Sequence, residues 1–445
     1  MTRVLALDVG TSSVRAQVFD ADAQELEPAQ RKYAGENDPA RIVELVREAV
    51  DEAVGGEEYD AVGGSCFGHS LLALDEHGRP LTPILGWRDT RSADAADWLS
   101  RRVDADAVHA RTGCHIHTSY WPAKLAWLAS EQPDVWRSTH SFASFCDFLY
   151  AELLGRPVAA STSMASATGL FDLHARAWDQ ELLAMLGLDA GQLPELSDQA
   201  VEGWYPALLD GACSNVGAGC VERTCAALMV GTSAALRVVY ETEQPQPRPG
   251  LFLYRLDDRR VVEGGAFSDG GNLHAWLGRT LADADGSVLD RGPEEHGLTF
   301  LALLGGERSP GWNPRARGAI DGLTFATTPR DLAQAALEGV GFAFAAVAEL
   351  LPEIDEVVAT GGALFNDPDW IQLVADTLAR PVVRCDVEEA SARGAVVLAL
   401  ERLGIRAPEA PLGRVFAPRR ERAEAYRWAR AQHERLYERL KGDWT

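Results

Sequence analysis

Lysine is scarce in this chain: among 445 residues only Lys32, Lys124 and Lys441 occur. A Walker A phosphate loop needs a Gly-Lys-Ser/Thr sequence, and none of these lysines stands in one. The chain also has no G-x-G-x-x-G after an apolar strand, no HExxH and no G-x-S-x-G. These absences disfavour P-loop NTPases, Rossmann dinucleotide enzymes, zinc metalloproteases and α/β-hydrolases.

Long apolar runs are missing as well. The apolar run after Arg3 ends at Asp8, which is too short for a signal peptide, and no run of about 18 apolar residues predicts a membrane span. The seven cysteines are odd in number and include no CxxC pair. We therefore expect a cytoplasmic protein with reduced, mostly buried thiols and no zinc site.

Positive charge is in deficit. Lys and Arg total 42 against 66 Asp and Glu, which gives a formal net charge of -24. Nucleic-acid binding needs clustered positive charge, so no nucleic-acid partner is expected, and no membrane partner either. The composition, 46% hydrophobic and 24% charged, is that of a globular protein. At about 100–200 residues per domain, the length indicates two or three domains.

Two segments of the chain are alike. Residues 5–18 read LALDVGTSSVRAQV, and residues 226–239 read AALMVGTSAALRVV. Each has an apolar strand, the tetrapeptide VGTS, a short turn, an arginine and a second β-prone run. The two VGTS copies are offset by about half the chain, which indicates two related domains that each open with a β-hairpin.

Apolar periodicity elsewhere alternates between strand and helix. It predicts helices near residues 41–54, 91–101, 121–130, 143–154, 178–186, 330–351, 367–379, 391–403 and 419–440. It predicts strands near residues 61–66, 71–74, 357–360 and 381–384. This alternation favours an α/β fold with mixed sheets flanked by helices.

The two VGTS turns suit phosphate binding. Glycine lets the backbone approach a phosphate, and hydroxyl and main-chain N–H groups can donate to it. The candidates are Gly10, Thr11 and Ser12 in the first copy and Gly231, Thr232 and Ser233 in the second. Asp8, before the first turn, can hold a magnesium ion. A single such turn is also an ordinary hairpin, but a pair fits a nucleoside triphosphate clamped between two domains.

Two glycine-rich stretches admit both a functional and a structural interpretation. Gly361-Gly362-Ala363 follows an apolar strand and precedes a helix, which fits a nucleotide against bare backbone or merely a tight β-to-α turn. Asp210 opens the small-residue run 210–219 and can act as a general base towards a sugar hydroxyl. From residue chemistry alone, Asp210 is better explained as a turn residue before glycine.

A further segment suits a polyhydroxylated ligand: Trp87-Arg88-Asp89-Thr90-Arg91, with His69 upstream. It combines an aromatic face, a carboxylate and guanidinium donors. The alternative is a strand end followed by a helix, with Asp89 as its N-cap and His69 as a structural histidine.

Taken in order, these segments resemble the FGGY carbohydrate kinase family over nearly the whole chain. The opening LALDVGTSSVRAQVFD is similar to the family's first phosphate hairpin, and GHSLLALDEHGRPLTPILGWRDTRS to its substrate-side stretch. TGCHIHTSYWPAKLAW contains the family's Pro-x-Lys-Leu-x-Trp helix. GGERSPGWNPRARGAIDGL, TGGALFNDPDWIQLVADTLARPV and SARGAVVLA resemble its GER-x-P segment, second signature and closing helix.

The resemblance implies two ribonuclease-H-like domains of the actin-like ATPase kind with a cleft between them. Residues 1–222 would form the sugar side, with the first phosphate hairpin and the base, and residues 223–445 the ATP side. It implies Asp210 as general base, Asp8 and Asp210 as magnesium-linked carboxylates, and carbohydrate contacts from His69, Trp87, Asp89 and Asp210. It implies ATP contacts from Gly10, Thr11, Ser12, Gly231, Thr232, Ser233, Gly271, Gly361, Gly362, Ala363 and Asn366.

The substrate is less determined than the reaction. The segment SCFGHS at residues 65–70 departs from the SGQMHG of xylulose kinases and is closer to the MHS-type pattern of gluconate kinases. We therefore expect gluconate, with xylulose or another pentulose or polyol as the alternative, and Arg88 or Arg91 as the partner of a sugar-acid carboxylate. The interval from Pro194 to Asp210 is shorter than is usual in the family.

Two other functions compete with the kinase interpretation: an actin-like ATPase without sugar transfer, and a sugar sensor without catalytic activity. The resemblance also allows a homodimer.

Overall fold

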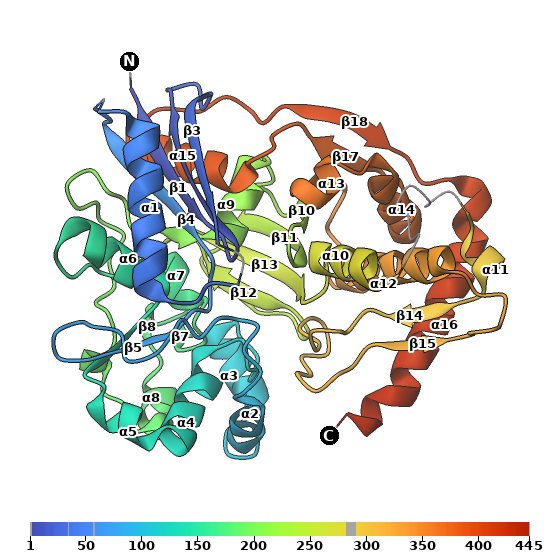
Figure 1. The fold of residues 1–445 in the computed structure, drawn as a ribbon, viewed down its shortest axis with the longest axis horizontal. Helices are drawn as coiled ribbons and strands as arrows, with labels where there is room; N and C mark the ends of the chain where they lie inside the picture. The colour runs from blue at the N-terminus through green and yellow to red at the C-terminus, as the bar shows by residue number, and fades with distance from the viewer. Residues whose placement is uncertain (1, 34, 57, 282–290, 445) are drawn as a thin grey trace.

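The computed structural model describes residues 2–33, 35–56, 58–281 and 291–444. Two mixed β-sheets form its two halves (Figure 1). The first has the order β3-β2-β1-β4-β9, from strands β1 (Val4–Val9), β2 (Ser13–Phe19), β3 (Glu25–Lys32), β4 (Ala61–Cys66) and β9 (Leu208–Leu209). The second has the order β12-β13-β11-β10-β16-β17-β18, from strands β10 (Cys225–Val230), β11 (Ala234–Glu241), β12 (Phe252–Arg255), β13 (Arg260–Phe267), β16 (Glu356–Thr360), β17 (Val382–Cys385) and β18 (Leu412–Phe416).

The two sheets repeat one pattern around their hairpins. Strand β1 pairs antiparallel with β2 and parallel with β4, and β10 pairs antiparallel with β11 and parallel with β16. Both β1 and β4 are fully buried, because parallel strands in the middle of a sheet are covered on both faces. The predicted α/β fold with two hairpin-opened halves is confirmed.

The first half also carries a lobe between β4 and β9, which lies below the first sheet in Figure 1. It contains β5 (Leu72–Leu74), β6 (Ser141–Ala143), β7 (Phe171–Asp172), β8 (Ala177–Trp178), α2 (Ala93–Ser100), α3 (Ala105–Thr112), α4 (Trp121–Glu131), α5 (Pro133–Ser138), α6 (Phe145–Leu154), α7 (Thr162–Ser166) and α8 (Gln180–Leu186). Helix α1 (Pro39–Val54) packs on β2 and β3.

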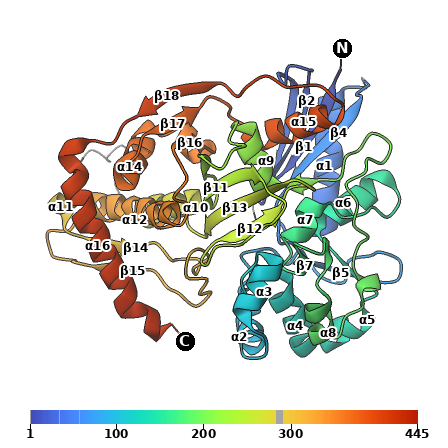
Figure 2. The ribbon, with the colours of Figure 1, turned by 180° about the vertical axis from the view of Figure 1, so that it is seen from behind.

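The second half adds α10 (Gly271–Thr280), α11 (Pro293–His296), α12 (Pro329–Glu349), α13 (Gly362–Phe365), α14 (Pro368–Leu378) and α16 (Ala423–Leu440), with the small pair β14 (Thr299–Leu301) and β15 (Ala319–Asp321). Seen from behind, α16 runs along the outer edge of this half beside β14 (Figure 2). All nine predicted helices are confirmed within a few residues, as are the four predicted strands.

Helix α9 (Asp210–Gly217) was not predicted, and its packing explains why. It lies against α15 (Ala390–Arg402) at very short range: a Cβ on Gly217 would stand 1.8 Å from the Ala390 carbonyl oxygen, and one on Gly394 1.8 Å from the Cys213 oxygen. Small residues here permit close contact between two helix backbones, whereas in a sequence they suggest a loop. Helix α15 also packs on β1 and β4, so it joins the second half to the first sheet.

Among the described residues, one helix, α12, is long and apolar enough to cross a membrane by length and composition alone. In its most apolar window 83% of the residues are buried inside the fold, so α12 is a core helix here. It fills the second half between the large sheet and helices α14 and α16.

The cysteine prediction is wrong at one pair. Cys220 and Cys225 form a disulfide in the segment that joins α9 to β10. The chain turns back between them and brings their Cα atoms to 5.0 Å, which a spacing of five residues does not reveal. The remaining five are buried free thiols: Cys66, Cys114, Cys146, Cys213 and Cys385.

Candidate active site

The sheet order gathers two carboxylates at one edge. Strands β1, β4 and β9 are adjacent and parallel, so Asp8 near the end of β1 and Asp210 just after β9 meet at their carboxyl ends. Ser65 of β4 lies between them and donates its hydroxyl to Asp8 Oδ1 at 2.8 Å. Asp8 is 6% exposed, and an Arg15 guanidinium nitrogen stands 3.5 Å from its other oxygen.

Burial raises the pKa of Asp210 to about 6. The positive charge of Arg237 lowers this pKa, whereas the neighbouring carboxylate of Asp8 raises it. Burial also raises the pKa of Asp8. Asp210 is thus a carboxylate that is ionised at neutral pH yet basic enough to accept a proton, as a general base must be.

These carboxylates also fit a magnesium ion. Two buried acidic side chains that repel each other are a site where a cation relieves the cost of burial. Magnesium uses one or two carboxylates and keeps several waters. In the part of the chain that the structure describes, no three His, Cys, Asp or Glu side chains are grouped as for a metal held by protein ligands alone. The donor set agrees with a water-rich ion of this kind.

The second hairpin turn is docked on the start of α10. The Gly271 N–H donates to the Gly231 carbonyl at 2.9 Å, and the Asn272 N–H to the Thr232 carbonyl at 3.0 Å. A Cβ on Gly271 would lie 2.4 Å from the Gly231 oxygen, so glycine is required for this contact. Sequence reasoning named Gly231, Thr232 and Gly271, and the structure brings them together.

The glycine pair after β16 joins the same group. Gly361 has φ +92°, and a Cβ there would meet the Val230 carbonyl oxygen at 2.5 Å. A Cβ on Gly271 would touch that of Ala363 at 3.6 Å. Gly362 faces open space, with no atom within 4 Å of an added Cβ. The Asn366 amide holds the turn by donating to the Gly362 carbonyl at 2.8 Å.

The first hairpin turn stands apart from that group. The Gly10 N–H closes the turn on the Ser13 carbonyl at 2.9 Å, and the Tyr33 hydroxyl donates to the Gly10 carbonyl. Thr11 and Ser12 are partly exposed at its tip. Asp210 opens α9, which lies between the two sheets (Figure 1), and Asp8 of the first hairpin and Arg237 of the second both act on its carboxylate.

His69 lies in the wall of the lobe, 8% exposed. Its Nδ1 stands 2.6 Å from the Ala167 carbonyl oxygen, which only accepts, so Nδ1 carries the proton. Nε2 is then the acceptor for the Arg308 guanidinium at 3.3 Å. Burial and the charge of Arg308 hold the pKa of His69 well below its usual value, so the ring is neutral.

The side chains of Trp87 and Asp89 have different surroundings in the structure. The buried Trp87 ring faces the guanidinium groups of Arg88 and Arg308, at 4.7 and 5.3 Å from its centre. The Asp89 carboxylate is bound by Arg91 Nε at 2.9 and 3.1 Å. The same Arg91 guanidinium stacks on Trp127. Trp87 therefore borders the space near Arg308, whereas Asp89 is engaged by its own neighbour.

A cavity of about 760 Å³ lies where the two halves face each other, lined by residues of both, among them Trp87, Arg88, Ser268, Asn272, Gly306 and Arg315. Arg315 crosses from the second half to α2, where it binds Asp94 and Asp97. The cleft expected between the halves is present, and it is bordered by Trp87 of the first half and by Asn272 of α10 in the second.

Two arginines were missed as site residues. Arg308 is 6% exposed, and in the described parts of the chain no carboxylate forms an ion pair with it. Its Nε has no hydrogen-bond partner there. Arg237 is also 6% exposed, exchanges hydrogen bonds with Asn215, and lies so close to Gly211 that a Cβ there would stand 2.8 Å from it. Both were in quoted segments, the GER-x-P stretch and the second hairpin, but no pattern indicated where they point.

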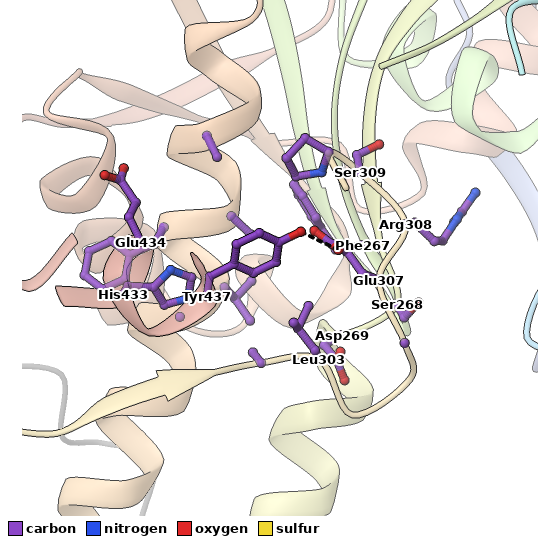
Figure 3. A pocket seen from close by; sticks show the side chains of 18 of the residues that line it. Phe267, Ser268, Asp269, Leu303, Glu307, Arg308, Ser309, His433, Glu434 and Tyr437 are labelled. Carbon is purple, nitrogen blue, oxygen red and sulfur yellow. Dashed lines mark hydrogen bonds between the residues drawn. The ribbon is translucent and has the colours of Figure 1, made fainter. Parts of the chain in front are cut away.

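The loop that carries Arg308 is held from behind. Figure 3 shows Glu307 and Arg308 turned to opposite sides of the loop, with Glu307 towards α16. The Tyr437 hydroxyl of α16 donates to Glu307 at 2.8 Å, beside a cavity of about 220 Å³, and burial raises the pKa of Glu307 to about 7. Helix α16 thus buttresses the loop from the side away from the cleft.

Comparisons with known proteins agree with this geometry. Residues 3–202 match the N-terminal domain of the FGGY family of carbohydrate kinases, and residues 226–401 match its C-terminal domain. The gluconokinase of Bacillus subtilis (strain 168) is 27% identical over 451 residues, covering 90% of this chain and 88% of that protein. The glycerol kinase of Thermus brockianus is 32% identical over 497 residues, covering 99% of each chain.

Solved structures give the same answer for the fold. A ligand-bound xylulose kinase from Lactobacillus acidophilus has a TM-score of 0.89 and 25% identity, covering 100% of this chain and 99% of that one. A gluconate kinase from the same species has a TM-score of 0.88 and 25% identity with the same coverage. The two-domain kinase fold is therefore confirmed, and no support is left for an actin-like ATPase without sugar transfer. The chain belongs to the FGGY family of carbohydrate kinases, and it transfers a phosphoryl group from ATP to an alcohol group of a sugar or sugar acid.

Proposed function

We propose that this kinase phosphorylates gluconate. The observation that carries the proposal is the guanidinium of Arg308, buried beside His69 with no carboxylate paired to it in the described residues. A buried, unpaired charge is costly, and the carboxylate of a sugar acid would supply the missing partner through charge-assisted hydrogen bonds. Likeness to a gluconokinase and to a gluconate kinase structure supports the same substrate.

This proposal replaces the cationic partner expected from the sequence. Arg91 is engaged by Asp89 and stacked on Trp127, so it is not free for a carboxylate. Arg88 stacks on Trp87 at the rim of the cleft. Of the His69-Ser70 pair that favoured gluconate, Ser70 is fully buried and its hydroxyl accepts the Phe145 N–H, so it serves the fold.

In the proposed reaction, Asp210 accepts the proton of the attacking hydroxyl as that oxygen bonds to the γ-phosphorus of ATP and the bond to ADP breaks. The hydroxyl groups of Thr11, Ser12, Thr232 and Ser233 and the N–H groups at the tips of both turns donate to the phosphates, whereas the Gly10 and Gly231 N–H groups close the turns. Gly361, Gly362, Ala363 and Asn366 border the adenosine. Asp8 and Asp210 would hold a magnesium ion, whose charge would offset that of the phosphates. His69, Trp87 and Asp89 line the carbohydrate side.

The proposal also assigns a different ligand to each half of the molecule. Residues 1–222 would bind the carbohydrate and residues 223–445 the nucleotide, with α15 as a helix of the second half that packs on the first sheet. A homodimer and a cytoplasmic location remain predictions. The main alternative substrate is xylulose, because the xylulose kinase of Lactobacillus acidophilus is as similar in fold as the gluconate kinase.

The test is a coupled ADP-release assay with gluconate, xylulose, ribulose and glycerol, on the wild type and on Arg308→Gln. We expect gluconate to have the highest kcat/KM. Loss of a charge-assisted pair should lower kcat/KM for gluconate by about 100-fold in Arg308→Gln and for the neutral substrates by less than about fivefold.

Two outcomes would count against this function. Higher kcat/KM for xylulose or glycerol in the wild type would reject gluconate. Equal losses for acidic and neutral substrates in Arg308→Gln would show that the guanidinium acts on the transferred phosphoryl group instead.

A further inference from the structure

Lys124 is the buried lysine of the chain. It lies on α4, is 1% exposed, and donates from Nζ to three backbone carbonyls: that of His69, that of Leu85 at 3.1 Å and that of Ser119 at 2.9 Å. The other two lysines are exposed at the surface: Lys32 on β3 and Lys441 after α16. In a chain whose remaining positive charges are arginines, a lysine has been placed where three acceptors converge.

The three carbonyls belong to the segments that carry the carbohydrate-side residues. One is the carbonyl of His69 itself, and Leu85 stands two residues before Trp87. Ser119, the third acceptor, donates its own hydroxyl to the Trp87 carbonyl at 3.2 Å. A single ammonium group therefore joins three segments that are separated in the sequence but adjacent in the lobe, next to the cleft residue Trp87.

His69 needs such support. Its φ of +66° lies in the left-handed region, which is unfavourable for a residue with a side chain and persists only where neighbours enforce it. Lys124 binds the His69 carbonyl, and the Trp121 indole N–H from the same helix binds the next carbonyl, that of Ser70, at 2.7 Å. Helix α4 thus fixes the peptide that sets the direction of the His69 ring.

Only the protonated amine can make all three bonds. An ammonium has three N–H donors in a tetrahedral arrangement, a neutral amine has two, and a guanidinium offers a planar fork. Burial lowers the pKa of Lys124 to about 7, and Arg308 lowers it further while Asp89 raises it. The other titratable groups around it, His69 and His117, have lowered pKa values and are neutral near pH 7.

We propose that Lys124 is a positioning residue of the carbohydrate side, whose ammonium form fixes His69 and Trp87 in the geometry that binds substrate. The proposal rests on the placement of the carbohydrate beside these two side chains. It makes the affinity for the carbohydrate depend on the protonation of a group that does not touch it.

The first test compares Lys124→Met and Lys124→Arg with Lys32→Met, a matched loss of an exposed lysine. Each is assayed with whichever carbohydrate the wild type uses best, so the result does not depend on gluconate being that substrate. We expect both Lys124 variants to raise the KM for the carbohydrate by about ten- to 100-fold, because small displacements of binding groups have effects of this size. The KM for ATP should stay within about twofold in all three variants, and Lys32→Met should match the wild type.

Lys124→Met and Lys124→Arg enzymes that are folded and keep the wild-type KM for the carbohydrate would overturn the proposal. So would a parallel rise in the KM for ATP, which would indicate general loosening of the fold. The substrate panel described above decides the gluconate proposal separately.

The second test uses the small number of lysines and needs only folded Lys124→Arg. In protein labelled with ¹³C-lysine, one of the three side-chain resonances should titrate with a midpoint near pH 7 and be missing from Lys124→Arg. The wild-type KM for the carbohydrate should rise above that midpoint, as one carbonyl loses its donor. Lys124→Arg, whose guanidinium stays charged, should show no such rise. A KM that stays constant while Lys124 loses its proton would overturn the proposal.

Discussion

The two VGTS hairpins share a scaffold but bring opposite charges near Asp210. In the first, Asp8 precedes the turn; in the second, the equivalent position is Met229. The first turn contributes a buried carboxylate bound to Ser65. The second contributes no acid but a buried arginine, Arg237, whose charge acts on Asp210. The two hairpins thus share a shape, and the different side chains on them make the first acidic and the second cationic near Asp210.

The arginines of the two hairpins show how that difference is built. Arg15 pairs directly across from Asp8, whereas Arg237 pairs across from Ala227, two positions farther from the turn than Met229. A shift of two residues keeps a side chain on the same face of a strand. Arg237 therefore faces as Arg15 does, but it lies deeper, where it is buried beside Asn215.

The second turn also differs because another segment of the chain, the start of α10, binds it. Its carbonyls accept from Gly271 and Asn272 at the start of α10, whereas the first turn is closed on its own strand. The proposed nucleotide side is thus an assembly of turns in contact with one another, and the first hairpin is a single turn beside the carboxylates. The comparison predicts which substitutions affect chemistry, which affect charge balance and which affect only nucleotide binding.

The largest effect should come from Asp210, the group that both hairpins face. In Asp210→Asn, loss of the general base should lower kcat by about 10²–10⁴-fold with little change in the KM for ATP. In the wild type, activity should fall as pH falls through about 6, the raised pKa of Asp210, because the base becomes protonated. Initial rates across this pH range measure both effects.

Stability provides the control for Asp210→Asn. A carboxyl whose pKa is raised on folding destabilises the native state at pH values above that pKa, so a neutral amide should leave Tm equal or higher at neutral pH. A folded Asp210→Asn enzyme with near-normal turnover would remove Asp210 from the role of base.

The second-largest effect should distinguish Arg237 of the second hairpin from Arg15 of the first. Arg237 lowers the pKa of Asp210, so Arg237→Gln should move the acid limb of the rate profile to higher pH and lower kcat at neutral pH by about tenfold. Arg15→Gln is the matched change in the first hairpin. Arg15 is partly exposed and paired with Asp8 and Glu389, so its loss should cost less than about threefold.

Profiles of kcat against pH for the two variants decide this point. Arg237→Lys, which keeps a positive charge, should restore part of the shift. Equal profiles for Arg237→Gln and Arg15→Gln would mean that the hairpins are alike in charge as well as in shape.

The sequence predicted those elements of the candidate site that depend on local composition. The hairpin turns, Asp8 and the glycine pair at 361–362 follow from strands that end in glycine and hydroxyl residues, and the structure places them where strand order brings such ends together. Helix α9 was missed because its small residues serve packing against α15, and single-sequence patterns do not distinguish this from a loop.

The remainder of the site depends on contacts between distant segments. Arg308 meets His69 across 239 residues of sequence, and Lys124 meets Leu85 across 39. Nothing near Arg308 in the sequence shows that it lacks an ion-paired carboxylate among the described residues while Arg91 has one, because the capture of Arg91 by Asp89 is itself a matter of local rotamers. Which charge remains unpaired is a property of the folded chain.

The smallest effect should come from Gly362, and it tests the nucleotide side of the comparison. An added Cβ on Gly362 meets no atom within 4 Å, so Gly362→Ala should leave the fold and the KM for the carbohydrate unchanged. If adenosine lies against this glycine, the methyl group should raise the KM for ATP about two- to fivefold.

In Gly271→Ala the Cβ would stand 2.4 Å from the Gly231 oxygen, so the turn itself must move and a larger rise in the KM for ATP is expected. Titrations of ATP by initial rate and by calorimetry measure both. An unchanged KM for ATP in Gly362→Ala, beside a raised one in Gly271→Ala, would place the adenosine away from the 361–366 turn while leaving the phosphates at the second hairpin.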